Sequence, residues 1–205
     1  MIAIIDYGSG NIAAIANIYK QIKVPHVVTR DPGELAAADR YILPGVGAFD
    51  TTMHHLHDTG IVAVLHDQVV ARGKKVLGVC VGMQILADSS EEGDLPGLGW
   101  IPGHVRKLDT SMLDTGPRLP HMGWNSIEPR DGMPIFEGID SARGFYFLHS
   151  YYFDARDDAH VIATVTYGNR MPCAVNAGNV FGMQFHPEKS HANGVAVFRS
   201  FAGIP

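Results

Sequence analysis

The 205-residue sequence has only two cysteines, no apolar run long enough to cross a membrane and no block of Lys or Arg. Two cysteines cannot form the disulfide framework of a small secreted protein, and the first ten residues have the pattern of a strand and a loop, not of a cleavable signal. A net charge of −5 without a basic cluster argues against nucleic acid or an anionic membrane as partner. We therefore expect a cytoplasmic protein.

The composition fits one globular domain over residues 1–205, since hydrophobic residues make up 46% and charged residues 18% of the chain. Over the first ninety residues, short apolar segments alternate with segments of helical periodicity. This alternation predicts an α/β fold with an open, mostly parallel, doubly wound sheet. The expected strands are 2–5, 27–28, 41–43 and 76–79, and the expected helices are 12–22, a short one from 32, 50–72 and 82–87.

The second half of the chain has a different pattern. Residues 93–103 are rich in Gly and Pro, and short strand-like segments follow in place of long helices. These segments predict an antiparallel portion appended to the parallel sheet, with a loop over 110–118 and a last helix over about 193–201. The expected strands of this portion are 105–108, 124–127, 145–148, 161–165, 173–175 and 180–185.

Cys80 lies where the apolar segment Val76–Val79 gives way to the helical spacing that begins at Gly82. A glycine stands two residues to either side of it, which is the pattern of a nucleophile elbow with Cys in place of Ser. The start of a helix points N–H groups and a positive dipole end at the thiol, which lowers a thiol pKa. The N–H of Val81 is then placed to stabilise an oxyanion. The alternative is a buried core cysteine, which this pattern alone does not exclude.

The segment Pro44-Gly45-Val46-Gly47 follows the third expected strand. In an open α/β sheet, ligands bind at the carboxyl ends of the strands, so this exposed backbone should lie beside the Cys80 elbow. A backbone N–H of this loop, at Val46 or Gly47, is the expected second oxyanion donor.

A histidine and a glutamate follow the last apolar strand. Alternation along a strand places Gln184 and His186 on one face, and Glu188 continues that face past Pro187. A general base with an orienting carboxylate completes a nucleophilic triad with Cys80. A lone histidine at a strand end has no such meaning, but the three residues together indicate this chemistry.

No metal or cofactor is expected. His54 and His57 are three residues apart on the expected helix 50–72, but no Glu or Cys nearby completes a ligand set, so they indicate a solvated helix face. Cys173 has no flanking glycines and is expected to pack in the core.

Beyond these separate residues, six segments spread over nearly the whole chain resemble those of the triad-type (class I) glutamine amidotransferases. More closely, they resemble the glutaminase subunits of imidazole glycerol phosphate synthase. The segments are Asp6–Asn11, Pro44–Gly47, Gly78–Gln84, Pro120–Asn125, Phe145–Tyr151 and Gln184–Ser190.

The resemblance implies that Cys80 attacks the side-chain amide of L-glutamine, that His186 transfers the protons and that Glu188 orients His186. It implies an oxyanion hole from the backbone of Val46, Gly47 and Val81. Glutamine would be bound by residues of three segments, namely Gly45, Gln84 and the consecutive His149, Ser150 and Tyr151.

In that family the glutaminase forms a heterodimer with a (β/α)8-barrel cyclase subunit. Ammonia passes through the barrel to a nucleotide, and the products are imidazole glycerol phosphate for histidine synthesis and AICAR. The resemblance places four residues at or near this interface: Asn11, Trp124, Tyr146 and Lys189.

Three alternatives remain from the sequence. Leu98-Gly99-Trp100 and Lys189-Ser190-His191 resemble second copies of this subunit that supply ammonia for surface-polysaccharide sugars. A catalytically inactive regulatory or assembly subunit is disfavoured by the intact Cys80, His186 and Glu188. An α/β-hydrolase with a Cys nucleophile is disfavoured because its acid precedes the histidine, whereas Glu188 follows His186.

Overall fold

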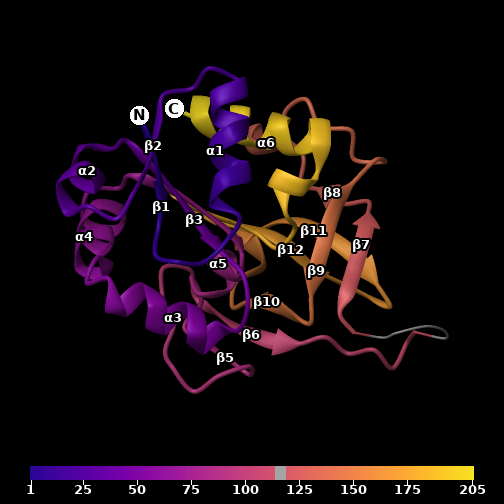
Figure 1. The fold of residues 1–205 in the computed structure, drawn as a ribbon. Coiled ribbons are helices and arrows are strands. Elements are labelled where there is room, and N and C mark those ends of the chain that lie inside the picture. The colour runs from indigo at the N-terminus through magenta and orange to yellow at the C-terminus, as the bar shows by residue number, and fades with distance from the viewer. Residues whose placement is uncertain (114–118) are drawn as a thin grey trace.

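The structure is a computed structural model that describes residues 1–113 and 119–205 (Figure 1). Part of the loop expected over 110–118 therefore lies outside the described residues. Within the described residues, no helix combines the length and the apolar character needed to cross a membrane.

An eight-stranded sheet in the order β2-β1-β3-β4-β13-β12-β11-β8 forms the centre of the molecule, and its first five strands are parallel. The strands of the first half are β1 (Ile2–Ile5), β2 (His26–Thr29), β3 (Arg40–Gly45) and β4 (Lys75–Cys80). The strands of the second half are β8 (Glu128–Pro129), β11 (Val161–Tyr167), β12 (Asn169–Ala177) and β13 (Val180–Met183). The mostly parallel sheet with an antiparallel extension confirms the expected fold class.

Helices cover both faces of the sheet (Figure 1). Helices α1 (Ile12–Gln21) and α6 (His191–Gly203) lie together on one side, and α2 (Pro32–Ala37), α3 (Phe49–Asp58) and α4 (Val62–His66) lie on the other. All of β1, and β4 after its first residue Lys75, is buried and apolar, as a parallel strand covered on both faces requires. One cluster of buried hydrophobic side chains runs through both halves of the chain, from Ile2 to Phe201.

Two smaller sheets stand beside the main one. A three-stranded sheet has the order β10-β6-β5, with β5 (Ser89–Ser90), β6 (Gly103–Lys107) and β10 (Tyr151–Ala155). A two-stranded antiparallel ribbon pairs β7 (His121–Asn125) with β9 (Phe145–His149). The turn between β9 and β10 thus joins the two small sheets next to the carboxyl ends of the parallel strands.

The structure corrects four expected elements. The helix expected over 50–72 is three pieces, α3, α4 and a π-helical turn (Asp67–Ala71), because Gly60 adopts a φ of +71° between the first two. The strand expected over 124–127 is β7, which begins three residues earlier, at His121, and ends at Asn125. The helix expected over 82–87 is only the single turn α5 (Val81–Gln84). Strand β13 ends at Met183, before the expected 185.

Candidate active site

The carboxyl ends of three neighbouring parallel strands place the expected catalytic segments together. In the sheet, β4 lies between β3 and β13, with Cys80 beside Gly45 and Val79 beside Met183. The chain leaving β13 then reaches His186, which begins a 3-10 helix over Pro187–Lys189. Because parallel strands end at the same edge, residues about a hundred positions apart in sequence meet here.

The Cys80 backbone has the geometry of a strained elbow. Its φ of 56° and ψ of −115° are unfavourable for a residue with a Cβ, and such strain concentrates at functional sites. The helix that follows is a single turn, so the dipole effect expected from the sequence comes only from its free N–H groups. The N–H of Val81 is the first of these, and no carbonyl of the same helix can reach it.

The glycines around the elbow are required by close backbone contacts. A Cβ on Gly82 would lie 1.9 Å from the carbonyl oxygen of Leu43, and one on Gly45 would lie 2.4 Å from the nitrogen of Gly82. A Cβ on Gly78 would lie 2.4 Å from the carbonyl oxygen of Gly82. The loop after β3 and the elbow after β4 therefore touch through their main chains.

We expect Gly82→Ala to lower the free energy of unfolding by about 3 kcal/mol, because the added methyl group meets backbone that cannot move aside cheaply. Gly203→Ala is the matched control, since a Cβ at Gly203 has nothing within 4 Å and Gly203 is a helical residue. Urea unfolding of both variants measures the difference. Equal stability of the two variants would contradict the close contact.

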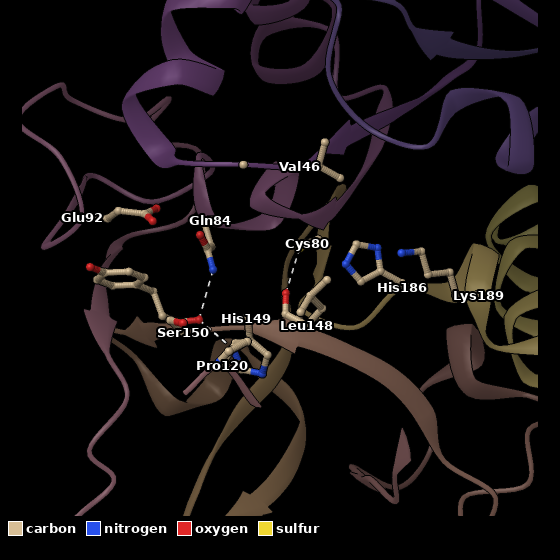
Figure 2. Close-up of a pocket in the computed structure, with 12 residues that line it drawn as sticks. Val46, Cys80, Gln84, Glu92, Pro120, Leu148, His149, Ser150, His186 and Lys189 are labelled. Carbon is tan, nitrogen blue, oxygen red and sulfur yellow. Dashed lines mark hydrogen bonds between the residues drawn. The ribbon is translucent and has the colours of Figure 1, made fainter. Parts of the chain in front are cut away.

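The His186 imidazole is held between Glu188 and Cys80. Its Nδ1 lies 2.8 Å from Oε1 of Glu188, and the side chains of His186 and Glu188 are 3% and 1% exposed. The carboxylate accepts the Nδ1 proton, which leaves Nε2 for the thiol, and Figure 2 shows the ring beside Cys80. Burial lowers the pKa of His186, but Cys80 and Glu188 raise it by more, to about 10. The imidazole is therefore charged at neutral pH.

The Cys80 thiol has further polar neighbours on the side of β9 and β13. Its Sγ lies 3.9 Å from the carbonyl oxygen of Leu148 and 4.0 Å from Nε2 of Gln184. Cys80 is only 4% exposed. The Cys80 thiol is thus largely shielded from bulk water, and it lines the pocket described below.

One of the expected oxyanion donors, the N–H of Val46, already has a hydrogen-bond partner in the structure. The N–H of Val46 donates to Oγ of Ser9 at 3.0 Å. The Ser9 hydroxyl in turn donates to the carbonyl oxygen of Val46, also at 3.0 Å. Ser9 follows β1, which neighbours β3, so the sheet order brings these two loops together. Val46 must release Ser9 before its N–H can serve an oxyanion.

A pocket of about 270 Å³ opens beside Cys80 (Figure 2). Nine of the residues expected at the site line it: Val46, Gly47, Cys80, Gln84, His149, Ser150, Tyr151, His186 and Lys189. Three expected residues do not line it but adjoin residues that do: Gly45 pairs with Cys80 in the sheet, Val81 follows Cys80, and Glu188 bonds to His186.

Three residues of the pocket were not expected from the sequence: Glu92, Pro120 and Leu148. Glu92 carries the clearest chemistry, because it brings a carboxylate to the pocket while its Oε2 accepts the N–H of Phe49 at 2.9 Å. It stands in an irregular Gly-rich segment without periodicity, so no local pattern could have placed it. Leu148 contributes its carbonyl oxygen, which sequence alone does not reveal.

Three residues expected at a partner interface form one surface cluster beside the pocket. Trp124 is 48% exposed, its ring is 6.5 Å from that of Tyr146, and Nζ of Lys189 lies 5.5 Å from the Tyr146 ring centroid. The fourth, Asn11, precedes α1 at its N-cap position without a side-chain capping hydrogen bond, and α1 contacts the 3-10 helix that holds Lys189. Trp124 is therefore a surface aromatic and not a core residue.

Two expectations outside the site are confirmed. Cys173 is fully buried, and burial raises the pKa of its thiol well above the usual value. His54 and His57 are both exposed on α3, as a solvated helix face requires.

Comparisons with known proteins agree with this geometry. Residues 3–202 match the family described as glutamine amidotransferase class-I. The chain is 48% identical to the imidazole glycerol phosphate synthase subunit HisH of Bdellovibrio bacteriovorus over 204 residues, covering 100% of both chains. It is 43% identical to the subunit HisH 2 of Pseudomonas aeruginosa over 206 residues, again covering 100% of both. A solved glutamine amidotransferase, 20% identical, shares the fold with a TM-score of 0.72 over 99% of each chain.

Proposed function

The chain belongs to the class-I glutamine amidotransferases and, within them, to the HisH subunits of imidazole glycerol phosphate synthase, and from this premise we propose how its site works. It is a glutaminase subunit of histidine biosynthesis. We propose that Cys80, His186 and Glu188 hydrolyse L-glutamine to glutamate and ammonia. The observation that carries this proposal is the strained Cys80 elbow beside an imidazole whose Nδ1 is bound to a buried carboxylate.

The proposed reaction has two halves. The Cys80 thiolate attacks the amide carbon of glutamine, and the tetrahedral intermediate expels the amide nitrogen after His186 protonates it, so that ammonia leaves and a glutamyl thioester forms. His186 then takes a proton from water, and the hydroxide attacks the thioester. Collapse of this second intermediate breaks the C–S bond, releases glutamate, whose carboxyl proton passes to solvent, and returns the Cys80 thiolate beside the protonated His186. Because His186 is already protonated at neutral pH, it can act as an acid in the first half without taking up a proton from solvent.

The oxyanion of each tetrahedral intermediate needs two donors. The N–H of Val81 supports this role because it begins α5 and has no intrahelical acceptor. The N–H groups of Val46 and Gly47 come from the loop that touches the elbow, and Gly47 lines the pocket with a φ of +97°. We propose that exchange of the Ser9 contact for the oxyanion completes the hole.

The amino-acid end of glutamine would lie at the other end of the pocket. Gln84 and the Ser150–Tyr151 backbone offer polar groups there, and Glu92 offers the one carboxylate among the lining residues described. A carboxylate is the group expected to face the substrate ammonium. We therefore add Glu92 to the proposed binding residues Gly45, Gln84, His149, Ser150 and Tyr151.

We propose that the partner is a cyclase subunit and that the two form a heterodimer. Met122 and Trp124 project from the same face of β7, 62% and 48% exposed, beside Tyr146 and the pocket. Exposed large apolar side chains next to a site mark an interaction surface. We also propose that residues 1–205 form a single domain, which the continuous core supports.

The experiment that tests this function measures glutamate release from L-glutamine, with and without the histidine-pathway cyclase subunit and its nucleotide substrate. Strong stimulation by cyclase and nucleotide together is the expected result. Activity that does not respond to this cyclase would favour the polysaccharide-type partner. The similarity to a HisH 2 subunit does not itself favour that alternative, because that relative's name also assigns it to the synthase.

Trp124→Ala is expected to weaken cyclase binding by tenfold to a hundredfold, because buried Trp residues are common hot spots of protein interfaces. Glutamine binding to the isolated subunit should be unchanged. Titration calorimetry with the cyclase measures the dissociation constant. Val70→Ala is the matched control, since Val70 is 50% exposed and lies in the π-helical turn, away from β7. Equal affinities of Trp124→Ala and Val70→Ala for the cyclase would show that Trp124 is not part of the interface.

A further inference from the structure

Two buried histidines lie beside the pocket, and the proposed reaction uses neither ring. His121 of β7 and His149 of β9 are 3% and 5% exposed, and Nδ1 of His121 lies 2.9 Å from Nε2 of His149. The His121 ring stacks on Phe147 and Tyr167, with ring centroids 4.6 Å and 4.2 Å away. A buried polar pair that is held this firmly requires an explanation.

The acceptors along this pair fix the position of every proton. Nδ1 of His149 lies 2.8 Å from the carbonyl oxygen of Tyr151, which can only accept, so His149 carries its proton there. Nε2 of His149 is then an acceptor, and Nδ1 of His121 donates to it. Nε2 of His121 accepts from the amide of Asn125 at 3.3 Å, whose other N–H donates to the carbonyl oxygen of Thr166 at 2.9 Å.

Both rings are neutral at physiological pH, which makes this arrangement the single one available. Burial lowers the pKa of His121 to about 4. Burial also lowers the pKa of His149, to about 3, against the opposing effect of the Tyr151 carbonyl. The hydrogen bonds therefore run in one direction, from Asn125 through both imidazoles to Tyr151.

The chain of hydrogen bonds continues into the pocket. The carbonyl oxygen of Tyr151 also accepts from Nε2 of Gln84 at 3.1 Å, and the same nitrogen donates to Oε1 of Gln184 at 3.0 Å. Because both amide hydrogens of Gln84 go to these acceptors, its oxygen must face the other way. Figure 2 shows the Gln84 nitrogen turned toward the Ser150 segment and the oxygen on the opposite side.

We propose that His121 and His149 are positioning residues for the substrate. They hold the Tyr151 carbonyl so that it fixes the Gln84 carboxamide, with its oxygen presented to the ammonium group of L-glutamine. This inference rests on the proposed function, since it concerns the same pocket. Neither imidazole takes part in bond making or breaking at the amide carbon.

The test compares His121→Ala with His121→Asn in the full-length chain. The Asn side chain places an N–H donor close to where Nδ1 of His121 lies, so it keeps the bond to His149 but loses the ring stacking. The probe is the glutamine analogue diazo-oxo-norleucine, which alkylates an active-site thiol at the position of the amide. Iodoacetamide, which has no amino-acid end, reports the reactivity of Cys80 alone.

We expect His121→Ala to raise the half-saturating concentration of the analogue about tenfold, the effect of one buried hydrogen bond left unsatisfied. His121→Asn should stay within about twofold of wild type, and iodoacetamide alkylation should be equal in all three proteins. Asn125→Ala is a milder variant that keeps both rings and removes only the outer donor, and a rise of about threefold is expected. Melting temperatures monitor folding.

Three results would overturn the inference. A half-saturating concentration of the analogue that is unchanged in His121→Ala would contradict the positioning role. An equal rise of this concentration in His121→Ala and His121→Asn would show that only the packing of the ring matters. If His121→Ala slowed alkylation by iodoacetamide as much as it weakened labelling by the analogue, the variant would have disturbed Cys80 itself and not the binding of the amino-acid end. Failure of the proposed function looks different, because wild-type Cys80 would then show no saturable labelling and no protection by L-glutamine.

Discussion

Cys80→Ala is expected to lower glutamate release by about 10⁶-fold, the loss seen when the nucleophile of a triad is removed. Without a thiolate there is no thioester, and water in this shielded site has no equivalent attacking group. Glutamine binding should persist, because Gln84, Glu92 and the Ser150–Tyr151 backbone are untouched. A coupled assay for glutamate and calorimetry with L-glutamine measure the two quantities.

Alanine is the right replacement because of the Cys80 backbone. The φ of 56° is strained for any residue with a Cβ, and Ala retains that strain, whereas Gly would relieve it and add backbone freedom. Cys173→Ala is the matched control, since this second free cysteine is fully buried in β12 and should leave turnover near that of wild type. Turnover by Cys80→Ala that matches this control would rule out Cys80 as the nucleophile.

The elbow could be read from the sequence because its signature is local, although the carbonyl oxygen that excludes a Cβ at Gly82 belongs to the distant Leu43. Only glycine fits at positions 78 and 82, where a Cβ would lie within 2.4 Å and 1.9 Å of carbonyl oxygens, so the requirement is written into the spacing around Cys80. The His186–Glu188 pair is local too, although the reason differs from the expected strand alternation. Strand β13 ends early, and the 3-10 turn begun by Pro187 brings Glu188 back to His186.

Hydrophobic patterning located most strands of the second half, and strand β7 shows why it misplaced the one expected over 124–127. Its polar residue His121 is buried, whereas Met122 and Trp124 are exposed, which inverts the usual arrangement of a half-buried strand. A search for apolar segments therefore placed the strand too late, at 124–127. The inversion has two physical sources in the structure: a buried hydrogen-bonded histidine pair on one face and a surface proposed to bind a partner on the other.

Other contacts of the site depend on long-range packing that no local pattern encodes. Ser9 reaches Val46 only because β1 and β3 are neighbours in the sheet. Glu92 reaches the pocket only because its carboxylate is anchored on the N–H of Phe49, at the start of α3. The resemblance of whole segments identified the family, but these pairings needed the fold.

His186→Ala is expected to lower glutamate release by about 10⁴-fold, and Glu188→Gln by about 10²-fold, because removal of the acid–base group costs more than removal of the group that orients it. The Gln side chain keeps the size of Glu188 and can still accept from Nδ1, but it carries no charge. Steady-state rates with saturating glutamine measure both losses. Equal losses would mean that Glu188 does more than orient the ring.

The pH dependence of stability and rate shows what the charge of Glu188 contributes, because Glu188→Gln changes the charge and keeps the size of the side chain. The folded pKa of His186, about 10, lies above the ordinary value of 6.5, so the charged ring stabilises the fold fully below pH 6.5 and this contribution is lost as the pH rises through 10. Glu188→Gln removes one of the two groups that raise this pKa. The loss of stability and the alkaline fall in rate should therefore both move to lower pH in that variant.

Urea unfolding between pH 6 and about pH 10 tests this directly when each variant is compared with wild type, because the other titrating groups cancel in the difference. The stability gap between wild type and His186→Ala should narrow as the pH rises, since only wild type loses the charged imidazole. A gap that stays constant over this range would mean that His186 is neutral in the folded protein. His186 would then serve as a base from the start, and the acid needed for ammonia release would have to come from the Cys80 proton.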